Sequence, residues 1–141
     1  MLANDVDNAP TGAFAGKRLA GNGAAGDLTG TTTYNVTGAI PVAQGGSSDC
    51  GVPEGVSAVL VNLVGIQPEA SGNFQAFATG TSPTGGVLNF ANVSPAMNNS
   101  NAVVVPVDAN GNMDLFVNAP GNVGNATVHA RGVILGYYTD N

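Results

Sequence analysis

Short apolar runs recur along this sequence at intervals of roughly ten residues, with turn-forming residues between them. The runs are rich in Val, Thr and aromatic residues, which favour β-strands, and Gly, Asn or Asp follows most of them. They occupy residues 31–37, 56–64, 74–79, 87–91, 102–107, 112–117 and 126–138. We therefore predict an all-β fold, an antiparallel β-sandwich of about seven strands.

Individual residues refine this prediction. Asn110-Gly111 lies between two apolar runs, which is a strong hairpin signal because both residues tolerate positive φ. Pro106 has no N–H to donate, so its strand is expected at a sheet edge or at a bulge. The long run 126–138 suggests a bend at Gly132, and the nearly continuous apolar run 56–64 suggests a central strand buried on both faces.

The composition excludes several other classes of protein. Charged residues make up 9% of the chain, against about 25% in an average soluble protein, and strong helix formers are scarce. The net charge of -6 repels phosphate backbones and anionic membranes, so we expect no nucleic-acid partner and no membrane insertion. No apolar stretch approaches the length of a membrane span, and the first residues do not form a secretion signal.

The first 30 residues differ from the rest, because six glycines punctuate them and few large apolar groups occur. We divide the chain into an extended Gly/Asn/Ala-rich arm, residues 1–30, and a β-sandwich domain, residues 31–141. The arm is expected to dock on its own sandwich or on neighbouring copies. Its candidate contact residues are Val6, Phe14, Leu19 and Leu28.

A search for catalytic groups finds little. The only imidazole is His129, on a predicted strand beside Arg131, where a structural role is the commoner one. Cys50 is the single cysteine, and it remains open whether it is an inert buried residue, a free thiol or an intermolecular bridge. We expect no enzymatic activity.

Acidic residues do not suggest a site either. Most of those that could pair for glycoside hydrolysis lie in predicted turns, where Asp caps the backbone. They are Asp49, Glu54, Glu69, Asp108 and Asp114. The segment Asp5-Val6-Asp7-Asn8 lacks the Gly and Glu of a calcium loop. We therefore expect no metal site and no cofactor.

Residues 51–139 carry a family pattern. The pattern consists of Val52-Pro53, Ala58-Val59-Leu60-Val61-Asn62-Leu63, Pro68, Leu88-Asn89-Phe90, the run 101–107, Gly111, Leu115-Phe116 and Gly136-Tyr137-Tyr138. It resembles the β-sandwich repeat module of secreted and cell-surface proteins of actinobacteria and related bacteria. These are strand and turn residues, so the resemblance implies a fold and no chemistry. The family's Arg- and Asp-containing first strand is replaced here by the Gly-rich arm.

Two functions of different classes fit these observations. The first is a non-enzymatic assembly protein at the virion surface of a bacterial virus, a head decoration protein or fibre-like module, held to copies of itself or to a capsid or other scaffold protein by the arm. The second is an extracellular module on a bacterial cell surface that binds polysaccharide through Asn-rich loops and by stacking sugars on exposed rings. The candidate rings are Tyr34, Phe74, Tyr137 and Tyr138.

Overall fold

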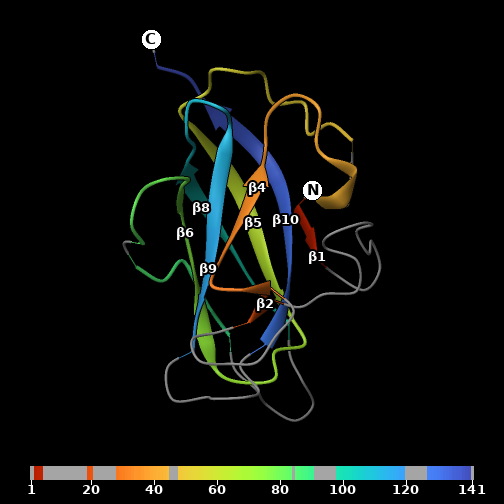
Figure 1. The fold of residues 1–141 in the computed structure, drawn as a ribbon, viewed down its shortest axis with the longest axis vertical. Helices are drawn as coiled ribbons and strands as arrows, with labels where there is room; N and C mark the ends of the chain where they lie inside the picture. Colours follow the sequence, from red (N-terminus) through yellow and green to blue (C-terminus); the bar gives the residue numbers. More distant parts are fainter. Residues whose placement is uncertain are drawn as a thin grey trace.

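Two β-sheets pack face to face in the computed structural model of the chain, which describes residues 2–4, 19–20, 28–44, 48–83, 85–90, 98–119 and 127–140. Seven strands from Thr31 onward form the two sheets, and all their pairings are antiparallel. They are β4 (Thr31–Asn35), β5 (Ala58–Ile66), β6 (Gly72–Ala78), β7 (Leu88–Phe90), β8 (Asn99–Pro106), β9 (Asn112–Asn118) and β10 (Thr127–Tyr138). The predicted all-β sandwich is confirmed (Figure 1).

The larger sheet has β5 at its centre, between β10 and β8. The side chains of β5 alternate between buried and half-buried, so only one of its faces belongs to the core. The prediction that this strand is buried on both faces was wrong. The β10 ladder runs evenly through Gly132 and changes register between Ile134 and Gly136, so the irregularity is a bulge at Leu135 and not a bend at Gly132.

The smaller sheet has the order β4-β9-β6-β7. Strands β8 and β9, which flank Asn110-Gly111, therefore belong to different sheets and do not pair, so the predicted hairpin was wrong. The turn itself has the expected local form, because Gly111 N donates to Asp108 O and Asp108 N donates to Asn112 O, both at 2.9 Å. Beyond these bonds the chain crosses from one sheet to the other. Pro106 stands at the end of an edge strand, as predicted.

Parts of the arm add short strands to the larger sheet. β1 (Leu2–Asn4) and β2 (Leu19–Ala20) both pair antiparallel with β10, and β3 (Leu28–Thr29) pairs parallel with β2. Leu19 is fully buried in the core of its own chain. Figure 1 shows β1 alongside β10, near the amino terminus.

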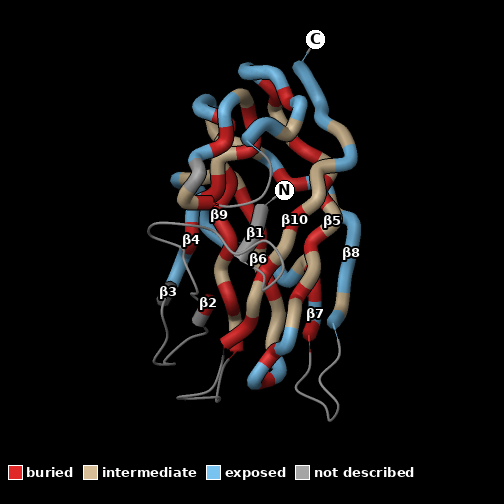
Figure 2. Tube along the Cα trace, turned by 90° about the vertical axis from the view of Figure 1, so that its right-hand side faces the viewer, coloured by how far each residue is buried: buried red, intermediate tan, exposed pale blue. Residues whose placement is uncertain are grey.

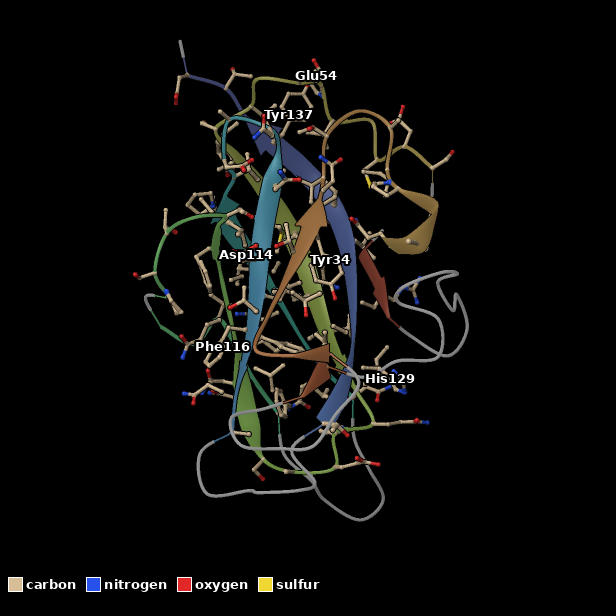
Figure 3. The ribbon with its side chains drawn as sticks, viewed as in Figure 1. Tyr34, Glu54, Asp114, Phe116, His129 and Tyr137 are labelled. Atoms are coloured by element: carbon tan, nitrogen blue, oxygen red, sulfur yellow. The ribbon has the colours of Figure 1, made fainter. Side chains whose placement is uncertain are left out.

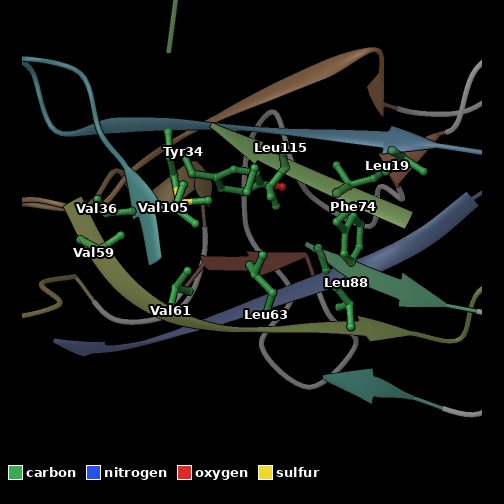
Figure 4. Close-up of a cluster of buried hydrophobic side chains, with 14 of the residues drawn as sticks. Leu19, Tyr34, Val36, Val59, Val61, Leu63, Phe74, Leu88, Val105 and Leu115 are labelled. Atoms are coloured by element: carbon green, nitrogen blue, oxygen red, sulfur yellow. The ribbon is translucent and has the colours of Figure 1, made fainter. Parts of the chain in front are cut away.

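The core lies between the sheets and consists of apolar side chains from both (Figure 4). Its largest fully buried members are Tyr34, Phe74, Leu19, Leu63, Met113 and Leu115. Phe74 packs its ring at 5.2 Å from that of Phe90, tilted by 57°. Gly65 lies against this pair, since a Cβ there would come within 3.4 Å of the Phe74 ring. Figure 2 shows the buried positions alternating with half-buried and exposed ones along the strands.

Candidate functional site

The groups considered for catalysis are dispersed over the molecule. His129 and Arg131 lie half-buried on the outer face of β10, opposite Ile66 and Val64 of β5. Cys50 is partly buried and packs against the core. Figure 3 places Glu54 and His129 at opposite ends of the sandwich, with Asp114 between them. The structure does not bring these residues into one site.

Four of the five candidate carboxylates accept hydrogen bonds that stabilise the fold. Asp49 accepts from Gly51 N at 2.6 Å. Asp114 accepts from the hydroxyls of Thr33 and Thr79, each at 2.7 Å, which ties β4 and the residue that follows β6 to β9. Glu69 accepts from the Thr127 hydroxyl. Among the described residues, no group of three or more His, Cys, Asp or Glu side chains could hold a metal ion.

Asp108 is the fourth, and it closes the turn after β8. Its Oδ1 accepts from Asn110 N at 2.9 Å and from Asn112 N at 2.7 Å. Burial alone raises the pKa of this carboxyl, but the hydrogen bonds from Asn112 and Asn110 outweigh burial and hold the pKa below its usual value. The carboxylate is therefore ionised at neutral pH and serves as a cap for the turn.

The four candidate rings divide into two buried and two exposed. Tyr34 and Phe74 are 1% and 0% exposed, so neither can stack on a sugar, and their prediction as ligand-facing residues is corrected. The reason is strand alternation: Tyr34 shares the inward face of β4 with Thr32, and Phe74 points inward from β6. Burial also raises the pKa of the Tyr34 phenol, which keeps it neutral. Tyr137 and Tyr138 are 47% and 50% exposed at the end of β10.

Of the predicted arm contacts, Leu19 is buried by its own chain and is not available to a neighbouring subunit in this arrangement. Val6 and Phe14 lie outside the described residues, and Leu28 is described only as part of β3. The docking of the arm on other copies stays a prediction. Its described strands lie on the chain's own sheet.

The outer face of the larger sheet carries exposed apolar side chains. Val104 lies opposite Leu60, and the bulge residue Leu135 and its neighbour Gly136 lie on the other side of Leu60. Val104 is 52% exposed and Leu135 56%, while Leu60 is half-buried. We call Leu60, Val104, Leu135 and Tyr138 the apolar outer patch. This patch could not be predicted from the sequence, because a long apolar run does not show which face of its strand is left without a packing partner.

The edges of the sheets differ in how they are protected. The outer edge of β10 pairs with β1 and β2 from Thr127 to Gly132, and the bulge at Leu135 interrupts it further on. Side chains of β8 bind one carbonyl within the short strand β7 and one just before it, since Asn99 Nδ2 donates to Asn89 O at 3.1 Å and Asn101 Nδ2 donates to Val87 O at 2.8 Å. Covering strands, a bulge and a very short edge strand are recognised means of keeping a sheet edge from pairing with another chain.

The side chain of Gln44 closes the end of β4. Gln44 belongs to the short 3-10 helix η2 (Val42–Gln44) and is 2% exposed. Its Oε1 accepts from Asn35 N at 2.8 Å, and its Nε2 donates to Asn35 O at 2.7 Å. The amide thus bonds both backbone groups of Asn35 as a neighbouring strand would. No sequence pattern marks this role, because Gln44 lies between the predicted strands.

Replacing Gln44 with alanine leaves the N–H and C=O of Asn35 without these partners. We expect the free energy of unfolding to fall by about 1–3 kcal/mol, the usual effect of leaving buried polar groups unsatisfied. Urea unfolding followed by circular dichroism measures this change. Gln75→Ala is the matched control, because it removes the same kind of side chain from a half-buried position on β6, away from Asn35. Equal unfolding midpoints for the two variants would show that the Gln44 amide does not stabilise β4.

Strand β8 lacks comparable protection along most of its length. It is eight residues long, and no described strand pairs with its second edge. Its sequence contains no charged residue, and only Pro106 at its end is a residue that blocks strand pairing. Figure 2 shows β8 along the margin of the molecule, mostly exposed. The β8 edge and the apolar outer patch beside it form the candidate interaction surface.

A polar groove of about 530 Å³ lies between the start of β8 and β7. Its lining consists of Gly86, Val87, Leu88, Asn89, Asn98, Asn99, Ser100 and Asn101. The amide nitrogens of Asn99 and Asn101 are used in bonds to the β7 segment, and Asn98 Oδ1 accepts from Gln67 N at 3.1 Å. The groove offers amide and backbone groups but no exposed ring among the residues that line it.

Comparison of the chain with protein-family models, with curated proteins and with solved structures finds no match. The resemblance to the surface repeat module therefore stays a prediction. In the part of the chain that the structure describes, no helix has both the length and the apolar character needed to cross a membrane.

Proposed function

We propose that this protein is a non-enzymatic structural module that assembles through protein–protein contacts. The observation that carries the proposal is the edge of β8, which has no charged residue and pairs with no described strand, beside the apolar outer patch. Soluble monomers rarely leave such an edge open, because it is a template for pairing with another chain. The described carboxylates with hydrogen bonds act within the fold, which also favours a structural role over catalysis.

Within this class we propose a virion surface component of a bacterial virus, a head decoration protein or a fibre-like module. Such particles are built from many copies of small domains that bind each other or a capsid scaffold through strands and arms. The low content of charged residues and the acidic net charge suit a surface that meets other protein and not nucleic acid. The arm supplies a further segment for contacts with neighbours.

Sedimentation velocity of the purified chain over a range of concentrations, combined with limited proteolysis, tests this proposal. We expect concentration-dependent association, and cleavage within the first 30 residues that slows in the associated form. A chain that stays monomeric at all concentrations and whose first 30 residues already resist protease would contradict the proposal, because neither the sandwich nor the arm would then need a partner.

An extracellular polysaccharide-binding module is the second candidate, favoured by the exposure of Tyr137 and Tyr138. Consecutive strand residues point to opposite faces, so the two rings would contact different ligands or different parts of one chain. A glycan array tests this function, with the Tyr138→Ala variant as the control for stacking. The candidate is abandoned if no glycan binds, or if Tyr137→Ala and Tyr138→Ala both bind as the unmodified chain does.

A further inference from the structure

We propose that β8 pairs with β8 of a second copy of this chain, antiparallel and about a two-fold axis at Ala102, so that the two larger sheets become one continuous sheet. This inference rests on the proposed assembly function and names its partner and its geometry. The argument uses the hydrogen-bond pattern of β8, its self-complementarity and the distribution of charge.

The hydrogen-bond pattern shows which backbone groups of β8 face away from β5. Val107 N donates to Ser57 O at 3.1 Å, just beyond the ladder that pairs Pro106 with Ala58. Backbone groups of successive strand residues point to alternate edges. Val105 and Val103 therefore direct their N–H and C=O groups toward β5, whereas Ser100, Ala102 and Val104 direct theirs toward the open edge. Pro106 has the same parity as these three, so the N–H that it lacks is one that would face the open edge.

The backbone groups that face the open edge of β8 can pair with the same groups of a second copy. In an antiparallel pairing about Ala102, this residue faces Ala102 of the partner subunit, and Ser100 faces Val104 of the partner subunit. The pairing thus contains three hydrogen-bonded residue pairs, and each of these exchanges two backbone hydrogen bonds. Pro106 of each subunit lies just beyond the paired segment, so its missing N–H removes no hydrogen bond from this pairing. A register that included Pro106 would lose such a bond, which favours the register centred on Ala102.

The distribution of charge favours a second copy of the chain as the partner at the β8 edge. The chain carries a net charge of -6, so two copies repel each other except where acidic groups are absent. Strands β5 and β8 contain no charged residue, and β10 contains no acidic residue. The histidine and arginine of β10, His129 and Arg131, lie at the end of the ladder far from Tyr138. The β8 edge and the strand beside it therefore present no carboxylate to an approaching acidic copy.

The apolar outer patch strengthens this pairing. Val104 belongs both to the open edge and to the patch, and its side chain lies on the outer face beside Leu60. In the paired sheet the two copies of Val104 stand on either side of the axis, next to Ser100 of the partner subunit. The apolar outer patches of the two subunits then lie on the same face of the continuous sheet, where a further layer of protein can cover both.

A cysteine at position 102 tests the geometry directly. Residues facing each other in a hydrogen-bonded antiparallel pair have Cα atoms about 5.5 Å apart, which is within the range that a disulfide spans. In a Cys50→Ser background, we expect Ala102→Cys to form a disulfide-linked dimer on mild oxidation. Ala109→Cys, at an exposed turn position, is the control and is expected to stay largely monomeric. Equal dimer yields from the two cysteines would overturn the proposal.

Lysine substitutions separate this inference from the assembly function on which it rests. Ala102→Lys places two like charges across the axis, and we expect it to weaken self-association at least tenfold, while Ala109→Lys adds the same charge elsewhere and has little effect. Circular dichroism checks that both variants fold. If the unmodified chain associates and both lysine variants associate equally well, the β8 pairing is wrong but the assembly function stands. A chain that is monomeric, with a protease-resistant arm, overturns both.

Discussion

Replacing Gly111 with alanine is expected to lower the free energy of unfolding by about 2–5 kcal/mol. Two effects add. Gly111 has a φ of +74°, which costs a residue with a Cβ about 1–2 kcal/mol. A Cβ at this position would also lie 1.8 Å from Thr37 Oγ1 and 2.7 Å from Thr37 Cβ, and Thr37 is itself buried. Because Gly111 O accepts from Val36 N, the turn cannot move away without breaking a contact to the segment after β4.

Two further glycines separate these effects. Gly80 has a φ of +85° but no atom within 4 Å of its Cβ position, so Gly80→Ala is expected to show the backbone cost alone. Gly85 has open space and no positive φ, so Gly85→Ala is expected to change the unfolding free energy by less than about 0.5 kcal/mol. Denaturant midpoints of the three variants measure the order. If Gly111→Ala is no worse than Gly80→Ala, the contact with Thr37 is not tight in solution.

Truncating Phe74 to alanine is expected to cost about 3–5 kcal/mol, as for other fully buried aromatic side chains. The ring is completely buried and fills the space between Gly65 of β5 and the ring of Phe90. The truncation leaves a cavity that the two sheets cannot close without changing their spacing. We therefore expect the loss to be seen in both the thermal and the urea midpoints, since it lowers the stability of the whole sandwich.

Two other substitutions are controls for this prediction. Phe74→Leu keeps more of the buried apolar area and is expected to cost less than Phe74→Ala. Tyr138→Ala removes a ring of similar size that is half exposed, and is expected to change stability by less than about 1 kcal/mol. Similar midpoints for Phe74→Ala and Tyr138→Ala would mean that Phe74 is not a core residue, and would make it a candidate ligand-facing ring again.

The positions of the seven strands from Thr31 onward could be predicted from the sequence, but their partners and the short strands of the arm could not. Every predicted run from 31–37 to 126–138 contains a strand. β8 begins at Asn99, earlier than predicted, because its ladder with Gly65 and Val64 overrides the low β-propensity of Asn and Ser. The turn at Asn110-Gly111 has hairpin chemistry, yet the strands beside it join different sheets. Local turn signals cannot distinguish these outcomes, since packing of the two apolar faces decides them.

The candidate site was the less predictable part. The burial of Tyr34 and Phe74 follows from period-two alternation, because each lies on the apolar face of its strand. The open edge of β8 has no sequence signature of its own, because it depends on which edges other segments protect. Gln44, Asn99 and Asn101 protect theirs through single side-chain amides, and nothing in the sequence separates these amides from the other Asn and Gln residues.

The position of β10 sets the order of events when the protein is made. This strand pairs with β1, β2 and β5, all of which precede it in the chain, and the pairing of Leu2 with Gly132 links very distant residues. A nascent chain that has not yet reached Thr127 therefore leaves one edge of β5 without its neighbour. Such long-range pairing is slow, and an unpaired edge favours aggregation in the meantime. Translation through Thr127–Tyr138 is thus the step at which a cell would gain most from a chaperone or from rapid elongation.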